Sequence, residues 1–129
     1  MSEPKQNGAL GFLQLCAERR FHRATMQAFE EATGLRPDEY WIEARAGGSP
    51  SWDDNSRTGR TAFRMGARHM GWSAHGDRCL RYPELSDAEL RTRLERVARR
   101  RAEEFPGARH YLLFALPGSV EVVPVGRRG

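Results

Sequence analysis

Two thiols and one imidazole are the side chains of this sequence with the clearest capacity for chemistry. Cys16 and Cys79 are its two cysteines, and His75 lies four residues before the second of them. Thiolate sulfur and imidazole nitrogen are ligands that zinc prefers, and a catalytic zinc site combines three protein ligands with one open position for water. Taken singly, the thiols fit core packing or redox chemistry equally well, and His75 fits a simple backbone hydrogen bond.

The strands that carry these residues determine whether they meet. The apolar run over residues 9–16 predicts a strand buried on both faces, as is typical of a parallel sheet. Residues 40–44 predict a second strand, and residues 72–75 predict a short third strand that ends at His75. Ligands bind outside the carboxyl ends of such strands. We therefore expect Cys16, the turn at residues 45–48 and His75 to converge at one edge of the sheet.

Helical patterns separate the strands and complete the fold. The expected helices cover residues 22–33 with Gly34 as the stop, 58–70 followed by Gly71, and 87–104 behind a capping-box pattern at Ser86 and Glu89. Two further strands are expected over residues 111–116 and 120–125. This order predicts an α/β fold with a mainly parallel sheet flanked by helices and one antiparallel C-terminal edge strand.

Length and composition indicate one globular domain. The chain has 129 residues, of which 39% are hydrophobic and 29% charged, which suits a single core. We expect a flexible N-terminus over residues 1–8, one domain over 9–126 and a basic tail over 127–129. The N-terminal residues lack the apolar stretch of a secretory signal and no run is long enough to span a bilayer, so we expect a cytoplasmic protein with reduced thiols and no membrane partner.

Several segments together resemble the β-carbonic anhydrase family, in the order in which that family has them. Residues 16–20, Cys-Ala-Glu-Arg-Arg, resemble its Cys-x-Asp-x-Arg motif, which also follows a buried strand. Residues 44–48, Ala-Arg-Ala-Gly-Gly, resemble its Arg-x-Ala-Gly segment. Residues 57–79 resemble its helix, strand and His-x-x-Cys pattern. The resemblance covers roughly residues 9 to 80.

The resemblance implies a zinc site and a reaction. In that family two cysteines and a histidine hold Zn²⁺, and a metal-bound hydroxide attacks carbon dioxide to give bicarbonate. Carried over, the zinc ligands are Cys16, His75 and Cys79, while Glu18 and Arg20 form the pair that orients the site and gates the fourth metal position. The family also implies a homodimer and a zinc-dependent lyase activity.

Three departures from the family pattern support an alternative function. Glu18 stands where the family has aspartate, three residues rather than two separate His75 from Cys79, and Leu80 replaces the glycine after the cysteine. The alternative is a non-catalytic relative whose fold serves as a binding or assembly module. A redox role for the two cysteines is a further hypothesis.

The helix over residues 87–104 carries six arginines and raises the question of nucleic-acid binding. Two glutamate–arginine pairs at helical spacing, Glu89 with Arg93 and Glu95 with Arg99, neutralise part of that charge. A net charge of +4 spread through the chain also provides no concentrated basic face. The pattern therefore favours a solvated helix face over a nucleic-acid interface.

Overall fold

A computed structural model describes residues 10–52 and 57–126. Five strands and three α-helices form the domain, with short 3-10 turns between them. In chain order the main elements are β1 (Gly11–Cys16), α1 (His22–Thr33), β2 (Tyr40–Arg45), α2 (Arg57–Arg64), β3 (His69–His75), α3 (Asp87–Glu104), β4 (Arg109–Leu116) and β5 (Ser119–Val125). The 3-10 turns are η2 (Arg19–Phe21), η3 (Pro37–Glu39) and η4 (Ser49–Trp52).

The five strands form one sheet in the order β2-β1-β3-β4-β5. Pairing is parallel between β2, β1, β3 and β4, and antiparallel between β4 and β5. This arrangement confirms the predicted α/β class, including the antiparallel strand at the C-terminal edge. The carboxyl ends of β1 and β3 therefore lie at the same edge of the sheet, as the functional argument requires.

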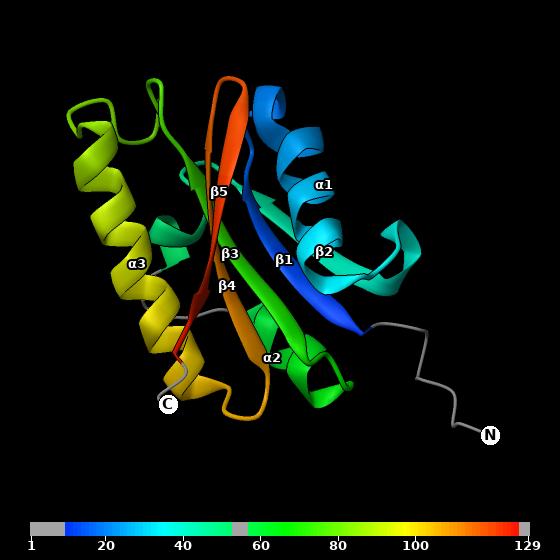
Figure 1. Ribbon diagram of the computed structural model, residues 1–129. Helices are drawn as coiled ribbons and strands as arrows, with labels where there is room; N and C mark the ends of the chain where they lie inside the picture. The colour runs from blue at the N-terminus through cyan, green and yellow to red at the C-terminus, as the bar shows by residue number, and fades with distance from the viewer. Residues whose placement is uncertain (1–9, 53–56, 127–129) are drawn as a thin grey trace.

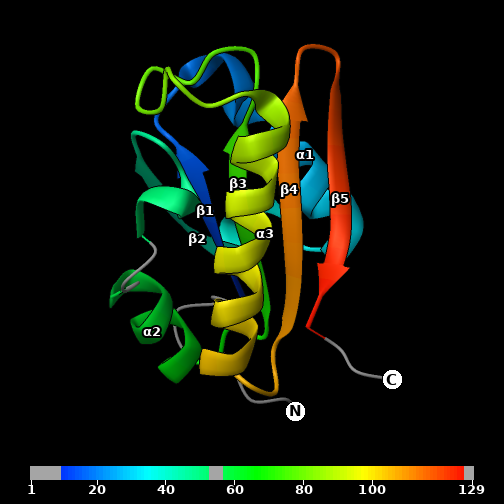
Figure 2. The same cartoon turned by 90° about the vertical axis from the view of Figure 1, so that its left-hand side faces the viewer.

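Helices cover both faces of the sheet (Figures 1 and 2). On the face covered by α3, here the α3 side, Phe12, Trp72 and Leu112 pack against Leu90 and Leu94 of the helix. On the opposite face, here the α1 side, a smaller apolar cluster gathers around Phe29. Burial on both faces is why the central strands β1 and β4 are nearly continuous apolar runs, whereas the edge strands β2 and β5 expose part of their residues.

The second helix is shorter than the sequence predicted. The expectation of a helix over 58–70 is wrong, because α2 ends at Arg64 and β3 already begins at His69. Gly66, with a φ of 110°, closes the helix: its N–H donates to the Phe63 carbonyl and the Ala67 N–H donates to Ala62. These two bonds form a Schellman motif, which favours glycine at this position.

Gly71 has a packing role inside β3 instead of a helix-ending role. A Cβ atom at this position would lie 2.8 Å from Leu13 and 2.9 Å from the Phe29 ring. The missing side chain lets α1 approach the sheet closely. The third strand therefore spans His69–His75 rather than the predicted 72–75, and the site at its end is anchored by a longer element.

The longest helix begins where the sequence predicted. The Ser86 hydroxyl accepts from the Glu89 N–H at 3.1 Å, and the Glu89 carboxylate accepts from the Ser86 N–H at 2.8 Å. This capping box fixes the start of α3 next to the loop that carries Cys79. None of the helices in the described ranges combines the length and apolar character needed to cross a membrane.

The predicted domain limits lie at the two ends of the described residues. The N-terminal segment over 1–8 and the tail over 127–129 lie outside the described residues, as does part of the loop expected over 47–56. The first strand begins at Gly11 rather than at residue 9, and the fourth begins two residues earlier than expected, at Arg109.

Candidate metal centre

The structure brings Cys16, His75 and Cys79 together at the carboxyl edge of the sheet. Their potential ligand atoms, two sulfurs and one ring nitrogen, all lie within 4.8 Å of one another. The three residues are buried, with exposed fractions of 8%, 2% and 4%. Cys16 ends β1, His75 ends β3, and Cys79 lies in the loop that follows. Long-range sheet pairing, rather than local sequence, creates the cluster.

One ring nitrogen of His75 has no hydrogen-bond partner. The Nδ1–H of this ring donates to the Gly76 carbonyl at 2.7 Å, which fixes the tautomer that leaves a lone pair on Nε2. That Nε2 atom is buried without a hydrogen-bond partner. The Phe21 ring stacks on the imidazole, with centroids 4.7 Å apart, and holds its orientation. A buried orphan nitrogen beside two thiols fits the ligand set of a metal ion.

A tight glycine turn supports the sulfur of Cys16. The Gly47 N–H donates to this sulfur at 3.3 Å. Gly47 and Gly48 have φ values of 94° and 66°, which favour glycine. A Cβ atom on Gly48 would lie 2.4 Å from the Ser73 carbonyl oxygen. The glycine pair therefore serves both the turn and the close approach to β3.

Cys79 lies in a loop with unusual backbone geometry. Asp77 and Arg78 both have positive φ values, 57° and 73°, in the region that non-glycine residues rarely occupy. Burial raises the pKa of the Cys79 thiol; hydrogen bonds from the Arg81 and Tyr82 backbone lower it in part, while Cys16 raises it further. A thiol held here without a cation stays protonated, whereas a bound cation favours its thiolate.

Glu18 and Arg20 lie beside the cluster, on the turn between β1 and α1. The Arg20 N–H donates to Glu18 Oε2 at 3.1 Å, and the Arg20 guanidinium Nε lies 3.4 Å from the same oxygen. The backbone hydrogen bond from Arg20 is the main cause of the lowered pKa of Glu18, and the Arg20 charge adds to it. The two residues are thus paired, and the carboxylate is held ionised.

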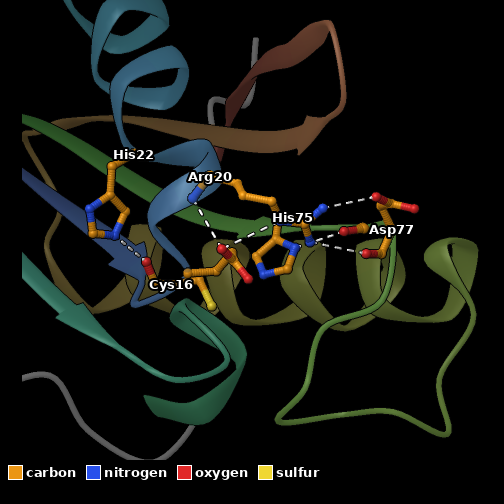
Figure 3. Close-up of polar contacts among 7 residues, drawn as sticks. Cys16, Arg20, His22, His75 and Asp77 are labelled. Carbon is orange, nitrogen blue, oxygen red and sulfur yellow. Dashed lines mark hydrogen bonds and ion pairs between the residues drawn. The ribbon is translucent and has the colours of Figure 1, made fainter.

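Arg20 also contacts Asp77, a residue of the loop between His75 and Cys79. Its Nη1 atom lies 3.1 Å from Asp77 Oδ2, and its Nη2–H donates to the Asp77 carbonyl at 3.4 Å (Figure 3). No sequence pattern links these two distant positions.

Two further residues, Phe21 and His22, lie close to the cluster. The His22 Nε2–H donates to the Cys16 carbonyl at 2.7 Å and so ties α1 to the end of β1 (Figure 3). Phe21 covers the imidazole, as described above. Their signal in the sequence was proximity alone, since both follow Cys16 within one turn. They also line a cavity of about 10 Å³ next to His75, about the size of one water molecule.

The remaining histidines and the arginine-rich helix have structural partners. His69 Nδ1 lies 3.0 Å from the Tyr111 hydroxyl, and the Trp72 indole N–H donates to His110 Nδ1 at 2.9 Å. On α3, Glu95 pairs with Arg99 at 2.9 Å as predicted, while the Arg93 guanidinium lies over the Tyr82 ring at 5.3 Å. Part of the positive charge of α3 therefore interacts with other groups of the domain.

Comparison with solved structures identifies a protein of the same fold. The β-carbonic anhydrase isoform I of the protozoan Trichomonas vaginalis superposes with a TM-score of 0.54, at 15% sequence identity, over 96% of this chain and 86% of that chain. No family model matches the sequence, and no curated protein matches it. The chain therefore shares the fold of this β-carbonic anhydrase. The homodimer and the cytoplasmic location stay predictions.

Proposed function

We propose that this protein binds Zn²⁺ through Cys16, His75 and Cys79 and hydrates carbon dioxide to bicarbonate. The observation that carries the proposal is the buried, unpartnered Nε2 atom of His75 within 4.8 Å of two cysteine sulfurs, at the sheet edge where α/β folds bind ligands. The shared fold with a β-carbonic anhydrase supports the same reading.

The donor set suits zinc better than harder cations. Two thiolates and one imidazole provide soft and borderline ligands, while magnesium and calcium prefer oxygen. When bound in such a set with an open position, zinc acidifies a coordinated water and so supplies a nucleophile near neutral pH.

The residues around the ligands have distinct tasks in this proposal. The Gly47 N–H stabilises the charge on the Cys16 sulfur, and the Gly76 carbonyl fixes the tautomer of His75. Arg20 keeps the Glu18 carboxylate ionised and directed, so that this carboxylate can accept a proton beside the metal. Phe21 covers one face of the imidazole and excludes water from it.

Metal content and hydration rate test the proposal in sequence. Wild type purified without an affinity tag is expected to hold close to one zinc per chain, and Cys79→Ser to hold far less. Thr61→Ala, a change at an exposed position on α2 outside the ligand set, is the matched control and is expected to retain zinc. Stopped-flow hydration above the buffer rate, lost in Cys16→Ser, would support the catalytic step.

The alternative function is a non-catalytic binding or assembly module. The features that favour it are the extra residue between His75 and Cys79 and the replacement of the glycine after Cys79 by Leu80, which is 83% exposed. Zinc binding with hydration only at the buffer rate would favour this alternative. Absence of zinc in wild type would overturn the metal site itself.

A further inference from the structure

Three segments meet at the metal site, and a single guanidinium joins two of them. Arg20 belongs to the turn that follows Cys16, whereas Asp77 belongs to the loop between His75 and Cys79. The guanidinium contacts both the carboxylate and the main-chain carbonyl of Asp77, at 3.1 and 3.4 Å. It also contacts Glu18. One arginine therefore lies between two carboxylates from two different ligand-bearing segments.

The loop that carries Cys79 needs such an anchor. Asp77 and Arg78 adopt left-handed backbone conformations in succession, and such residues persist only where surrounding contacts hold them. The main-chain N–H of Asp77 donates to Asp87 Oδ1 at 2.9 Å, which ties the same residue to the first turn of α3. Asp77 is thus held from its backbone by α3 and from its side chain by Arg20.

We propose that Asp77 is a positioning residue that, through Arg20, fastens the Cys79 loop to the Cys16 turn and so holds the two sulfurs in register. The proposal assigns Asp77 to the arginine rather than to the metal. Its effect on zinc rests on the proposed function, while its effect on the loop does not. Asp77 and Arg20 are both about half exposed, so their ion pair, here called the tether, is expected to contribute only modestly to stability.

The opening of the Cys79 loop is measured as the rate at which a thiol reagent modifies Cys79. The measurement uses the metal-free Cys16→Ser background, where Cys79 is the single thiol. Asp77→Asn removes the charge and keeps a side chain that tolerates left-handed backbone. Labelling is expected to be about two- to fivefold faster than in the parent, because the buried thiol is reached through local opening. The urea midpoint is expected to fall only slightly, because the same small free energy is lost from the folded state.

Matched variants make the result specific. Asp38→Asn removes a distant exposed carboxylate that lies 4.0 Å from Arg36, and is expected to leave labelling unchanged. In an Arg20→Ala background, Asp77→Asn is expected to add little, since Asp77 acts through that arginine.

The outcomes separate this inference from the proposed function. Equal labelling of Asp77→Asn and Asp38→Asn, or an undiminished Asp77→Asn effect without Arg20, would overturn the tether whether or not zinc binds. In the zinc-loaded protein with both cysteines, Asp77→Asn is expected to lose zinc to a chelator about two- to fivefold faster. A wild-type protein that takes up no zinc would overturn the proposed function. The labelling result would then still decide whether the ion pair of Asp77 with Arg20 holds the Cys79 loop in place.

Discussion

The backbone N–H of Gly47 points at the sulfur of Cys16 from 3.3 Å away. The two residues lie on different loops, one after β1 and one after β2, and the parallel register that pairs Cys16 with Arg45 brings them together. Gly47 also lies against the loop that carries Cys79, because a Cβ atom there would be 2.8 Å from Arg81 and 2.9 Å from the Tyr82 ring. One glycine therefore contacts both thiol-bearing segments.

Gly47→Ala is expected to destabilise the protein more than its backbone conformation alone explains. Both the positive φ and the contacts oppose the new methyl group, for a total of about 3 kcal/mol in urea unfolding. Gly34→Ala is the control, because Gly34 has a φ of 79° with no atoms near its Cβ position, and is expected to cost about 1 kcal/mol. Equal losses in the two variants would contradict the packing role of Gly47.

Zinc is expected to raise the thermal stability of the wild type and to leave His75→Asn unaffected. A ligand that binds only the folded state stabilises it by about 2.7 kcal/mol at one hundred times its dissociation constant. His69→Gln, at the other end of the same strand, is expected to keep the zinc response. A melting temperature in wild type that is indifferent to zinc and to chelator would argue against the metal site.

His110 is expected to make the protein less stable in mild acid. Its Nδ1 accepts from Trp72 while its Nε2–H donates to the Phe105 carbonyl at 3.0 Å, so the buried ring is neutral. Burial lowers the pKa of His110. The unfolded chain thus binds the proton more readily, and the free energy of unfolding falls as pH drops below about 6.5.

Urea unfolding between pH 7 and pH 5 measures this effect. The paired glutamates with lowered pKa, such as Glu18 and Glu121, lose their contribution only as pH falls through and below their ordinary value of 4.5, outside the window. His110→Gln is expected to flatten the slope. Burial also lowers the pKa of His69, so His69→Gln removes a second contribution of the same sign. A wild-type slope retained in the double variant would refute this assignment.

Glu104 is expected to matter more for stability than other glutamates on α3. It lies 2.7 Å from the Arg101 guanidinium, whose side chain is 2% exposed, and 2.6 Å from that of Arg60 on α2. Glu104→Gln takes a charge from a buried arginine, which is expected to cost about 2 kcal/mol. Glu95→Gln, next to exposed Arg99, is expected to cost less than about 1 kcal/mol.

The double variant Arg101→Met with Glu104→Gln tests the reason for that loss. If the cost comes from leaving the Arg101 charge buried without its carboxylate, the apolar methionine is expected to recover most of the stability. A double variant as unstable as Glu104→Gln would show that the contact of Glu104 with Arg60 on α2 carries the effect instead. Chemical denaturation of the four proteins distinguishes the two results.

Local signals in the sequence were sufficient for most of the fold. Gly34 and the Ser86–Glu89 capping box mark helix ends whose hydrogen bonds are local, so α1 and α3 could be predicted within a residue. The end of α2 was misplaced because two glycines compete for the role. Gly66 forms the Schellman motif. Gly71 is a glycine because a side chain there would clash with the distant Phe29 ring, and no local pattern reveals that contact.

The site was partly predictable for a similar reason. Cys16 and His75 end parallel strands, and parallel strand ends meet at one edge, so their proximity follows from topology. Asp77 was found only by the structure as a partner of Arg20, because that contact depends on the two left-handed residues in the loop. The Phe21 ring over His75 depends likewise on a single turn of 3-10 helix.

The candidate ligands come from opposite sides of the sheet. Cys16 packs with the α3 side, whereas His75 stacks on Phe21, next to the start of α1. A cation held between them would link β1 to β3 and close a loop that contains α1, β2 and α2. The entropic cost of closing that loop is already met in the folded sheet, because β1 and β3 pair there. The cation would therefore add its binding free energy to a sheet that its own strand pairing has already assembled.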